Sequence, residues 1–187
     1  MTVDEFIAEY WGKPGGSERS NFAPFIFDLC ALIGEKRPGP AEQGQLGAYE
    51  FEGSVPKGSF RSLEAKGWID LYKRGHFIME AKQSYLKPDQ AGLDLGEPSG
   101  PRAPSGALYD KLMRDARAQA ENYAKNLPAA EPVAPFLVVC DIGRAFEIYH
   151  DAAGNGRGYI FFPDKQSYRI ELTDLRDPDI LARLKAI

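Results

Sequence analysis

The sequence contains little cysteine and little histidine, which argues against a small protein stabilised by disulfides and against a small zinc-binding protein. Its 187 residues include two cysteines and two histidines. Cys30 and Cys140 stand far apart inside apolar runs, so we expect reduced core thiols rather than a disulfide or a reactive thiol. We expect His76 to lie in an exposed turn and His150 to be structural. The two cysteines and two histidines together show none of the spacings that bind zinc.

The sequence also lacks a long apolar run and an excess of basic residues. No run approaches the roughly 18 apolar residues of a membrane span, and the acidic start does not resemble a signal peptide, so we expect a cytoplasmic chain without a membrane partner. Lys and Arg number 23 against 27 Asp and Glu, a net charge of −4. That balance disfavours tight, autonomous binding to nucleic acid, which relies on many Lys and Arg contacts to phosphate.

What is present fits one globular domain over 1–187. Hydrophobic residues make up 43% and aromatic residues 12% of the chain, enough for a packed core. Proline and glycine crowd residues 86–106, which predicts a long loop. Residues 151–187 are expected to form a C-terminal appendage.

Apolar spacing predicts four helices, and two of them lie near the N-terminus, over 3–11 and 20–33. We place the start of the second near Asn21, with Ser20 or Ser17 as its N-cap, because Pro24 is tolerated only in the first helical turn. The other two are 107–126, with Leu108, Leu112, Ala116, Gln119 and Tyr123 on one stripe, and 177–187.

Alternating or continuous apolar runs predict strands at 48–55, 67–73, 76–82, 135–141, 145–150, 159–162 and 167–171. The run at 135–141 is apolar throughout, as expected of a buried central strand. The order of elements predicts an α/β fold with an α-β-β-β-α-β core, in which helices flank a central mixed sheet.

Three charged residues in the second and third strands carry the chemistry. Glu80 and Lys82 lie two residues apart, so their side chains share a face, and the preceding turn brings Asp70 near Glu80. A divalent cation such as Mg²⁺ relieves the repulsion between two carboxylates and activates water beside a phosphate. The Lys82 ammonium would orient or deprotonate that water. The alternative is a salt bridge between Asp70 and Lys82 beside a solvated Glu80.

The pattern Asp-x9-Glu-x-Lys across a hairpin resembles the signature of the PD-(D/E)XK nuclease superfamily, with Ile69 replacing the usual proline. The resemblance implies a restriction-endonuclease-like core with Asp70, Glu80 and Lys82 as catalytic residues. It also implies that Glu18 joins Asp70 and Glu80 as a metal ligand. The segment from Gln119 to Tyr123 resembles the Gln-x-x-x-Tyr motif of the RecB-like branch.

Other interpretations of the surrounding residues stay open. Glu18 would also favour a helix N-terminus through the helix dipole. Gln119 and Tyr123 would also suit ordinary helix packing, and Gln83 is either a surface residue or a partner of the metal site.

A narrower resemblance covers nearly the whole chain. The segments SERSNFAPFIFDLCALIG, YEFEG, GWIDLYKRGHFIMEAKQS, QAENYA and FLVVCDIGRAFEIY are similar to the N-terminal region of MmeI-like restriction-modification enzymes. In that family one polypeptide carries a nuclease, a helical connector, an adenine methyltransferase and a target-recognition region. The sequence has no Asn-Pro-Pro-Tyr motif and no glycine-rich cofactor loop, so it resembles the nuclease part alone, as a fragment or as a stand-alone relative.

The resemblance implies a Mg²⁺-dependent DNA endonuclease, with Mn²⁺ as a substitute, that acts in restriction of foreign DNA. Its implied partners are double-stranded DNA and the methyltransferase and target-recognition regions, and dimerisation for double-strand cleavage is left open. The competing hypotheses are a non-catalytic DNA-binding or scaffold module with this fold, and a nuclease acting on RNA or on repair intermediates.

Overall fold

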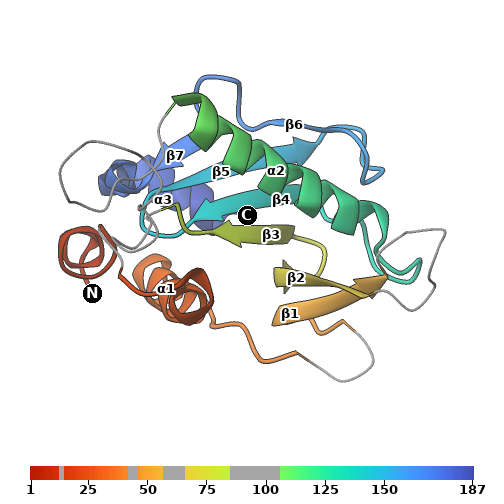
Figure 1. Cartoon of the computed structure of the whole chain (residues 1–187), viewed down its shortest axis with the longest axis horizontal. Coiled ribbons are helices and arrows are strands. Elements are labelled where there is room, and N and C mark those ends of the chain that lie inside the picture. The colour runs from red at the N-terminus through yellow and green to blue at the C-terminus, as the bar shows by residue number, and fades with distance from the viewer. Residues whose placement is uncertain (13–14, 42–45, 57–65, 85–105) are drawn as a thin grey trace, which may run out of the picture.

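The computed structural model describes residues 1–12, 15–41, 46–56, 66–84 and 106–187 (Figure 1). Nearly all of the loop predicted at 86–106 therefore lies outside the described residues. The elements follow in the predicted order: η1 (Glu5–Trp11), α1 (Glu18–Ile33), β1 (Tyr49–Pro56), β2 (Lys66–Lys73), β3 (Phe77–Lys82), α2 (Gly106–Lys125), β4 (Phe136–Asp141), β5 (Ala145–Asp151), β6 (Tyr159–Phe161), β7 (Arg169–Glu171), η2 (Leu172–Arg176) and α3 (Pro178–Lys185).

The strands form one mixed seven-stranded sheet, which confirms the predicted fold class. Its order is β1-β2-β3-β4-β5-β6, and β7 also pairs with β5. Among the strands that the structure describes, β3 and β4 run parallel, with α2 between them in the chain, and the other pairs are antiparallel. Gly75 and Gly143 have positive φ in the turns of the β2–β3 and β4–β5 hairpins, a conformation that glycine adopts without strain.

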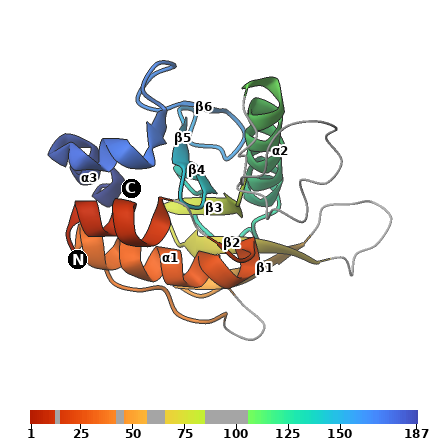
Figure 2. The same cartoon turned by 60° about the vertical axis from the view of Figure 1, so that its left-hand side comes forward.

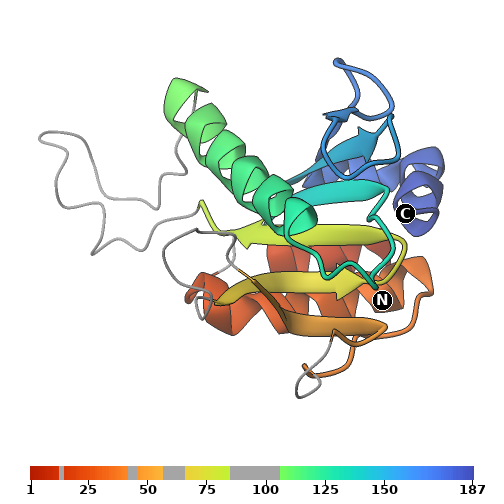
Figure 3. The ribbon, with the colours of Figure 1, turned by 90° about the vertical axis from the view of Figure 1, so that its right-hand side faces the viewer.

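Helices cover both faces of the sheet. Figure 2 shows η1, α1 and α3 on one side of it and α2 on the other, and Figure 3 shows α2 crossing the strands. Two apolar clusters fill these layers. One joins Phe25 and Ile26 of α1 to Met79 and Phe146, and the other joins Met113 and Tyr123 of α2 to Ile78. Among the described residues no helix is long and apolar enough to cross a membrane.

The predicted start of the second helix was wrong. The helix begins at Glu18 rather than near Asn21, and Ser17 is its N-cap: the Ser17 side chain accepts a hydrogen bond from the Ser20 backbone N–H. Pro24 consequently lies inside the helix, where it removes one backbone donor. The reciprocal hydrogen bonds between Ser17 and Ser20 satisfy donors at the helix start, which outweighs the preference of Pro24 for the first turn.

Two predicted apolar stripes were also partly wrong. On α2 the buried residues include Tyr109, Met113 and Ala120, whereas Leu108 is 66% exposed. The buried face is therefore rotated by about one residue from the predicted stripe. Near the N-terminus, helical spacing groups Val3, Phe6, Ile7, Tyr10 and Trp11. Phe6 and Trp11 are buried but Tyr10 is exposed, because the segment is a π-helix, in which residues five apart share a face.

Candidate functional site

The candidate site lies where β2 separates from β3. Pairing between the two strands ends at Leu71 opposite Met79, one residue before Asp70 would face Glu80. The Asp70 carboxylate occupies the gap, and its Oδ2 accepts a hydrogen bond of 2.7 Å from the Ala81 backbone N–H. The hairpin thus brings Asp70 beside the Glu80–Lys82 segment, as the spacing of the three residues predicts.

Glu80 is the most unusual group of the site, because a carboxylate with 1% exposure is costly to ionise. Its Oε1 lies 2.6 Å from Lys82 Nζ, but its buried Oε2 has no hydrogen-bond partner among the described residues. Burial raises the pKa of Glu80 to about 8. The negative charge of Asp70 adds to the rise, and the Lys82 ammonium opposes it.

The other two residues of the motif respond to the same surroundings. Burial works to lower the pKa of Lys82, but the carboxylates of Glu80, Glu18 and Asp70 outweigh it, so the pKa rises and the ammonium stays charged. Burial raises the pKa of Asp70, against the Ala81 hydrogen bond and the Lys82 charge. Lys82 is therefore suited to orienting an anion or a water molecule as a cation.

Glu18 reaches the same strand from the first turn of α1. Its Oε2 accepts a hydrogen bond of 3.1 Å from the Gln83 backbone N–H, and Asn21 Nδ2 donates to Gln83 Oε1 at 2.8 Å. Gln83 is therefore fixed against α1 and is not a free surface residue. Asp70 and Glu18 together bind the N–H groups of Ala81 and Gln83, on the edge of β3 that β2 has left.

Gln119 and Tyr123 approach from the opposite face, on α2. Gln119 Nε2 donates a 2.8 Å hydrogen bond to the Tyr123 hydroxyl. Burial raises the pKa of Tyr123, the Gln119 hydrogen bond opposes this, and the charges of Glu80 and Asp70 raise it further. The Tyr123 ring lies against Gly67 of β2, three residues before Asp70. Tyr123 is both a packed core residue, 6% exposed, and a neighbour of the site.

The fit of these residues to Mg²⁺ rests on Glu80. A buried carboxylate oxygen without a donor is a suitable metal ligand, and Mg²⁺ usually takes one or two protein carboxylates and completes its shell with water and phosphate. Asp70 and Glu80 supply such a pair. Within the described ranges no three His, Cys, Asp or Glu side chains gather closely enough to hold an ion, and the metal role of Glu18 stays a prediction.

Comparison with protein families shows the family to which the chain belongs. The family described as MmeI, N-terminal domain, matches residues 1–187. The chain belongs to this family. No curated protein and no solved structure matches it. Membership associates this MmeI-type domain with restriction enzymes, as the resemblance of its segments implies.

Two functional features of this MmeI-type domain were not predicted from its sequence. Glu52 has a φ of 53°, in the left-handed region that only glycine adopts easily, and its charge contributes to the raised pKa of Asp70. Asp141 is 1% exposed and binds Ser84, directly after the motif. The signal for Asp141 was present in FLVVCD, an apolar strand that ends in an acid. No local pattern marks Glu52.

The cysteines and histidines of this MmeI-type domain agree with the predictions for them. Cys30 and Cys140 are free and buried. His76 is exposed in the β2–β3 turn, where its Nδ1 lies 3.1 Å from the Ile187 carbonyl oxygen. The His150 ring packs against Phe136 and Phe162.

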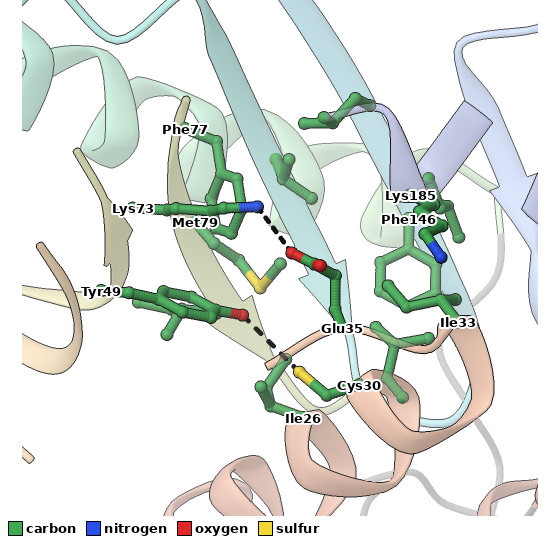
Figure 4. Close-up of a pocket in the computed structure, with 15 residues that line it drawn as sticks. Ile26, Cys30, Ile33, Glu35, Tyr49, Lys73, Phe77, Met79, Phe146 and Lys185 are labelled. Atoms are coloured by element: carbon green, nitrogen blue, oxygen red, sulfur yellow. Dashed lines mark hydrogen bonds and ion pairs between the residues drawn. The ribbon is translucent and has the colours of Figure 1, made fainter. Parts of the chain in front are cut away.

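A cavity of about 50 Å³ lies away from the motif, between α1, the β2–β3 hairpin and the C-terminal residues (Figure 4). Figure 4 shows the Tyr49 hydroxyl facing Cys30, 3.6 Å from its Sγ, and Lys73 paired with Glu35. The cavity is on the α1 side of the sheet. Glu80 and Lys82 alternate with Met79, which lines the cavity, so they point to the α2 side and the cavity is separate from the site.

Proposed function

We propose that this chain is a Mg²⁺-dependent endonuclease domain that hydrolyses phosphodiester bonds of double-stranded DNA in restriction of foreign DNA. The observation that carries the proposal is Glu80, which lies beside Asp70 and Lys82. Its buried Oε2 has no hydrogen-bond partner in the part of the chain that the structure describes, and its pKa is raised. A buried carboxylate of this kind destabilises a fold unless a cation binds it, so its presence supports a role in metal binding.

The residues of the site would have different roles in hydrolysis, according to their charge. Asp70 and Glu80 would hold the ion, which supplies Lewis-acid activation of water and of the scissile phosphate when bound. The charged Lys82 would orient the attacking water and stabilise the negative charge that develops on the phosphate oxygens. Glu18 holds the Gln83 backbone, and as a third carboxylate it would complete the ion's shell through water.

Restriction requires partners that this domain does not supply. The net charge of −4 and the family membership support a division of labour, in which target-recognition and methyltransferase regions of an MmeI-like enzyme deliver the DNA. Cleavage of both strands would then need either two copies of the domain or two successive reactions at one site.

The test is nicking of supercoiled plasmid with Mg²⁺ or Mn²⁺ by the wild type and by Lys82→Ala. We expect the variant to lose at least about 100-fold in rate, because it lacks the cation that stabilises the transition state. Lys111→Ala is the matched control, since Lys111 is 65% exposed on α2 and, among the described residues, pairs with Asp115 one turn further along the helix. Equal nicking by the wild type and Lys82→Ala would reject the mechanism.

Metal binding is measured in parallel by calorimetry, because it does not depend on delivery of DNA. We expect Asp70→Ala and Glu80→Ala to abolish Mn²⁺ binding and Lys111→Ala to leave it unchanged. A wild-type chain that binds neither Mg²⁺ nor Mn²⁺ would contradict the proposal of a metal-dependent nuclease.

A further inference from the structure

A second buried carboxylate lies beside the motif and has no part in the proposed chemistry. Asp141 ends β4, pairs in register with Lys82 of β3, and is 1% exposed. The Lys82 ammonium is bound to Glu80 instead. Asp141 Oδ1 accepts the Ser84 backbone N–H at 2.8 Å, and its Oδ2 accepts the Ser84 hydroxyl at 2.5 Å.

The need for this contact follows from the strand pairing. β2 leaves β3 after Met79, and the last backbone hydrogen bond from β3 to its other neighbour joins the Lys82 carbonyl to the Ile142 N–H, at 2.8 Å. Gln83 and Ser84, the described residues that follow β3, have no strand partner. Carboxylates take over that role: Asp70 binds the N–H of Ala81, Glu18 that of Gln83, and Asp141 that of Ser84.

The three carboxylates differ in how many of their oxygens accept hydrogen bonds from this segment. Asp70 and Glu18 each use one oxygen for a backbone N–H and would offer the other to the proposed metal, whereas both oxygens of Asp141 are engaged by Ser84. Burial raises the pKa of Asp141, and the Ser84 hydrogen bonds and the charge of Arg144 oppose the rise. Arg144 also reaches Ser84 Oγ at 3.3 Å and lies over the Tyr109 ring, 3.5 Å from its centroid.

We propose that Asp141 and Ser84 form a clasp that positions the end of β3, so that Lys82 stays beside Glu80 and Gln83 stays against α1. Both are positioning residues, since they act through the backbone of β3 and not on the metal or the DNA. The inference rests on the proposed function for its catalytic consequence only. The positioning itself is a property of the metal-free chain.

Hydrogen exchange of individual backbone amides, followed by NMR, tests the positioning. In Asp141→Ala we expect exchange at Gln83 and Ser84 to rise at least about 10-fold, while amides in the middle of the β4–β5 hairpin stay within about 2-fold. Asp141→Asn retains an oxygen for the Ser84 N–H and should restore protection at Ser84. Ser84→Ala removes the hydroxyl alone and should give a smaller rise, which keeps the test informative if Asp141→Ala does not fold.

The matched control is Asp151→Ala. Asp151 is also buried, 3% exposed, and also accepts a backbone N–H, that of Gly156. It lies at the other end of β5, about 20 Å away along the strand. This variant should leave exchange at Gln83 and Ser84 unchanged. Unchanged exchange in Asp141→Ala would overturn the clasp.

The catalytic consequence is read from single-turnover nicking. We expect Asp141→Ala to lower the rate about 10-fold or more while the Mn²⁺ concentration for half-maximal binding stays within about 3-fold, because Asp70 and Glu80 remain. Asp141→Asn should recover most of the rate. An unchanged rate in an active protein would show a purely structural contact and overturn the proposal. A wild type that neither binds Mn²⁺ nor nicks DNA would instead reject the proposed function, and amide exchange would still decide the clasp.

Discussion

At the scale of single residues, Glu80 destabilises the folded chain through its burial and is also the main proposed metal ligand. Its pKa of about 8 means that the folded chain retains a proton at neutral pH that the unfolded chain, with a pKa near 4.5, has lost. Folding is therefore disfavoured increasingly as the pH rises from about 4.5 to 8. Metal-binding carboxylates at active sites commonly carry such a cost.

We expect Glu80→Gln to stabilise the metal-free chain above pH 8 by up to about 5 kcal/mol, which corresponds to roughly ten degrees or more in Tm, because glutamine needs no proton to remain neutral. The gain should vanish below pH 4.5, where Glu80 is protonated in both states. Thermal unfolding between pH 4 and 9 measures it. Glu9→Gln, which changes an exposed carboxylate of η1, is the control and should have no comparable effect. A gain independent of pH would contradict this explanation.

Metal binding should release the same proton. Below pH 8 a cation must displace it from Glu80, so we expect about one proton per Mn²⁺ bound near pH 6.5 and close to none above pH 9. Calorimetric titrations in buffers of different ionisation enthalpy count these protons. Proton release that does not change with pH would show that Glu80 is not the group that binds.

At the scale of elements, the site depends on how closely β2 packs against α2. A Cβ added to Gly67 would lie 2.6 Å from Tyr123 Cε1 and 3.6 Å from Val55 Cγ2. Tyr123 is held by Gln119 and is nearly buried, so it has little room to move. The glycine is therefore required by the contact between a strand and a helix that are far apart in the sequence.

Gly67→Ala should destabilise the chain by about 1–3 kcal/mol, because either β2 or Tyr123 must shift. Gly15→Ala is the control, since a Cβ at Gly15 would meet nothing within 4 Å. Urea or thermal unfolding of both variants gives the comparison. Equal stability of the two variants would show that the close approach is not restrictive.

At the scale of the whole molecule, acidic charge limits what the domain does alone. With 27 acidic and 23 basic residues, we expect a Kd for short duplex DNA of about 10⁻⁵ M or weaker at physiological salt. Adding Mn²⁺ should tighten binding by the wild type and by Glu9→Gln several-fold, because the bound cation offsets the repulsion between the acidic site and phosphate. It should not tighten binding by Glu80→Gln, which lacks a proposed metal ligand. Fluorescence anisotropy measures these constants. Nanomolar binding by the metal-free wild type would contradict the proposed dependence on partner regions.

The sequence by itself determined the elements and the motif. The order of helices and strands follows from apolar periodicity, and the two-residue spacing of Glu80 and Lys82 sets their common face. The turn between β2 and β3 brings Asp70 close, as the hairpin predicts. These features were predictable because each depends on neighbours within about a dozen residues.

Tertiary structure alone decided the burial of Glu80, the separation of β2 from β3 and the clasp between Asp141 and Ser84. The start of the second helix at Glu18 follows from local capping by Ser17, but the contact of the Glu18 carboxylate with Gln83 is tertiary. A pKa near 8 and an unpaired oxygen arise from desolvation by segments remote in the chain, such as α2 and β4. Local pattern carries no information on which remote groups exclude water, and that exclusion determines the chemistry of a carboxylate.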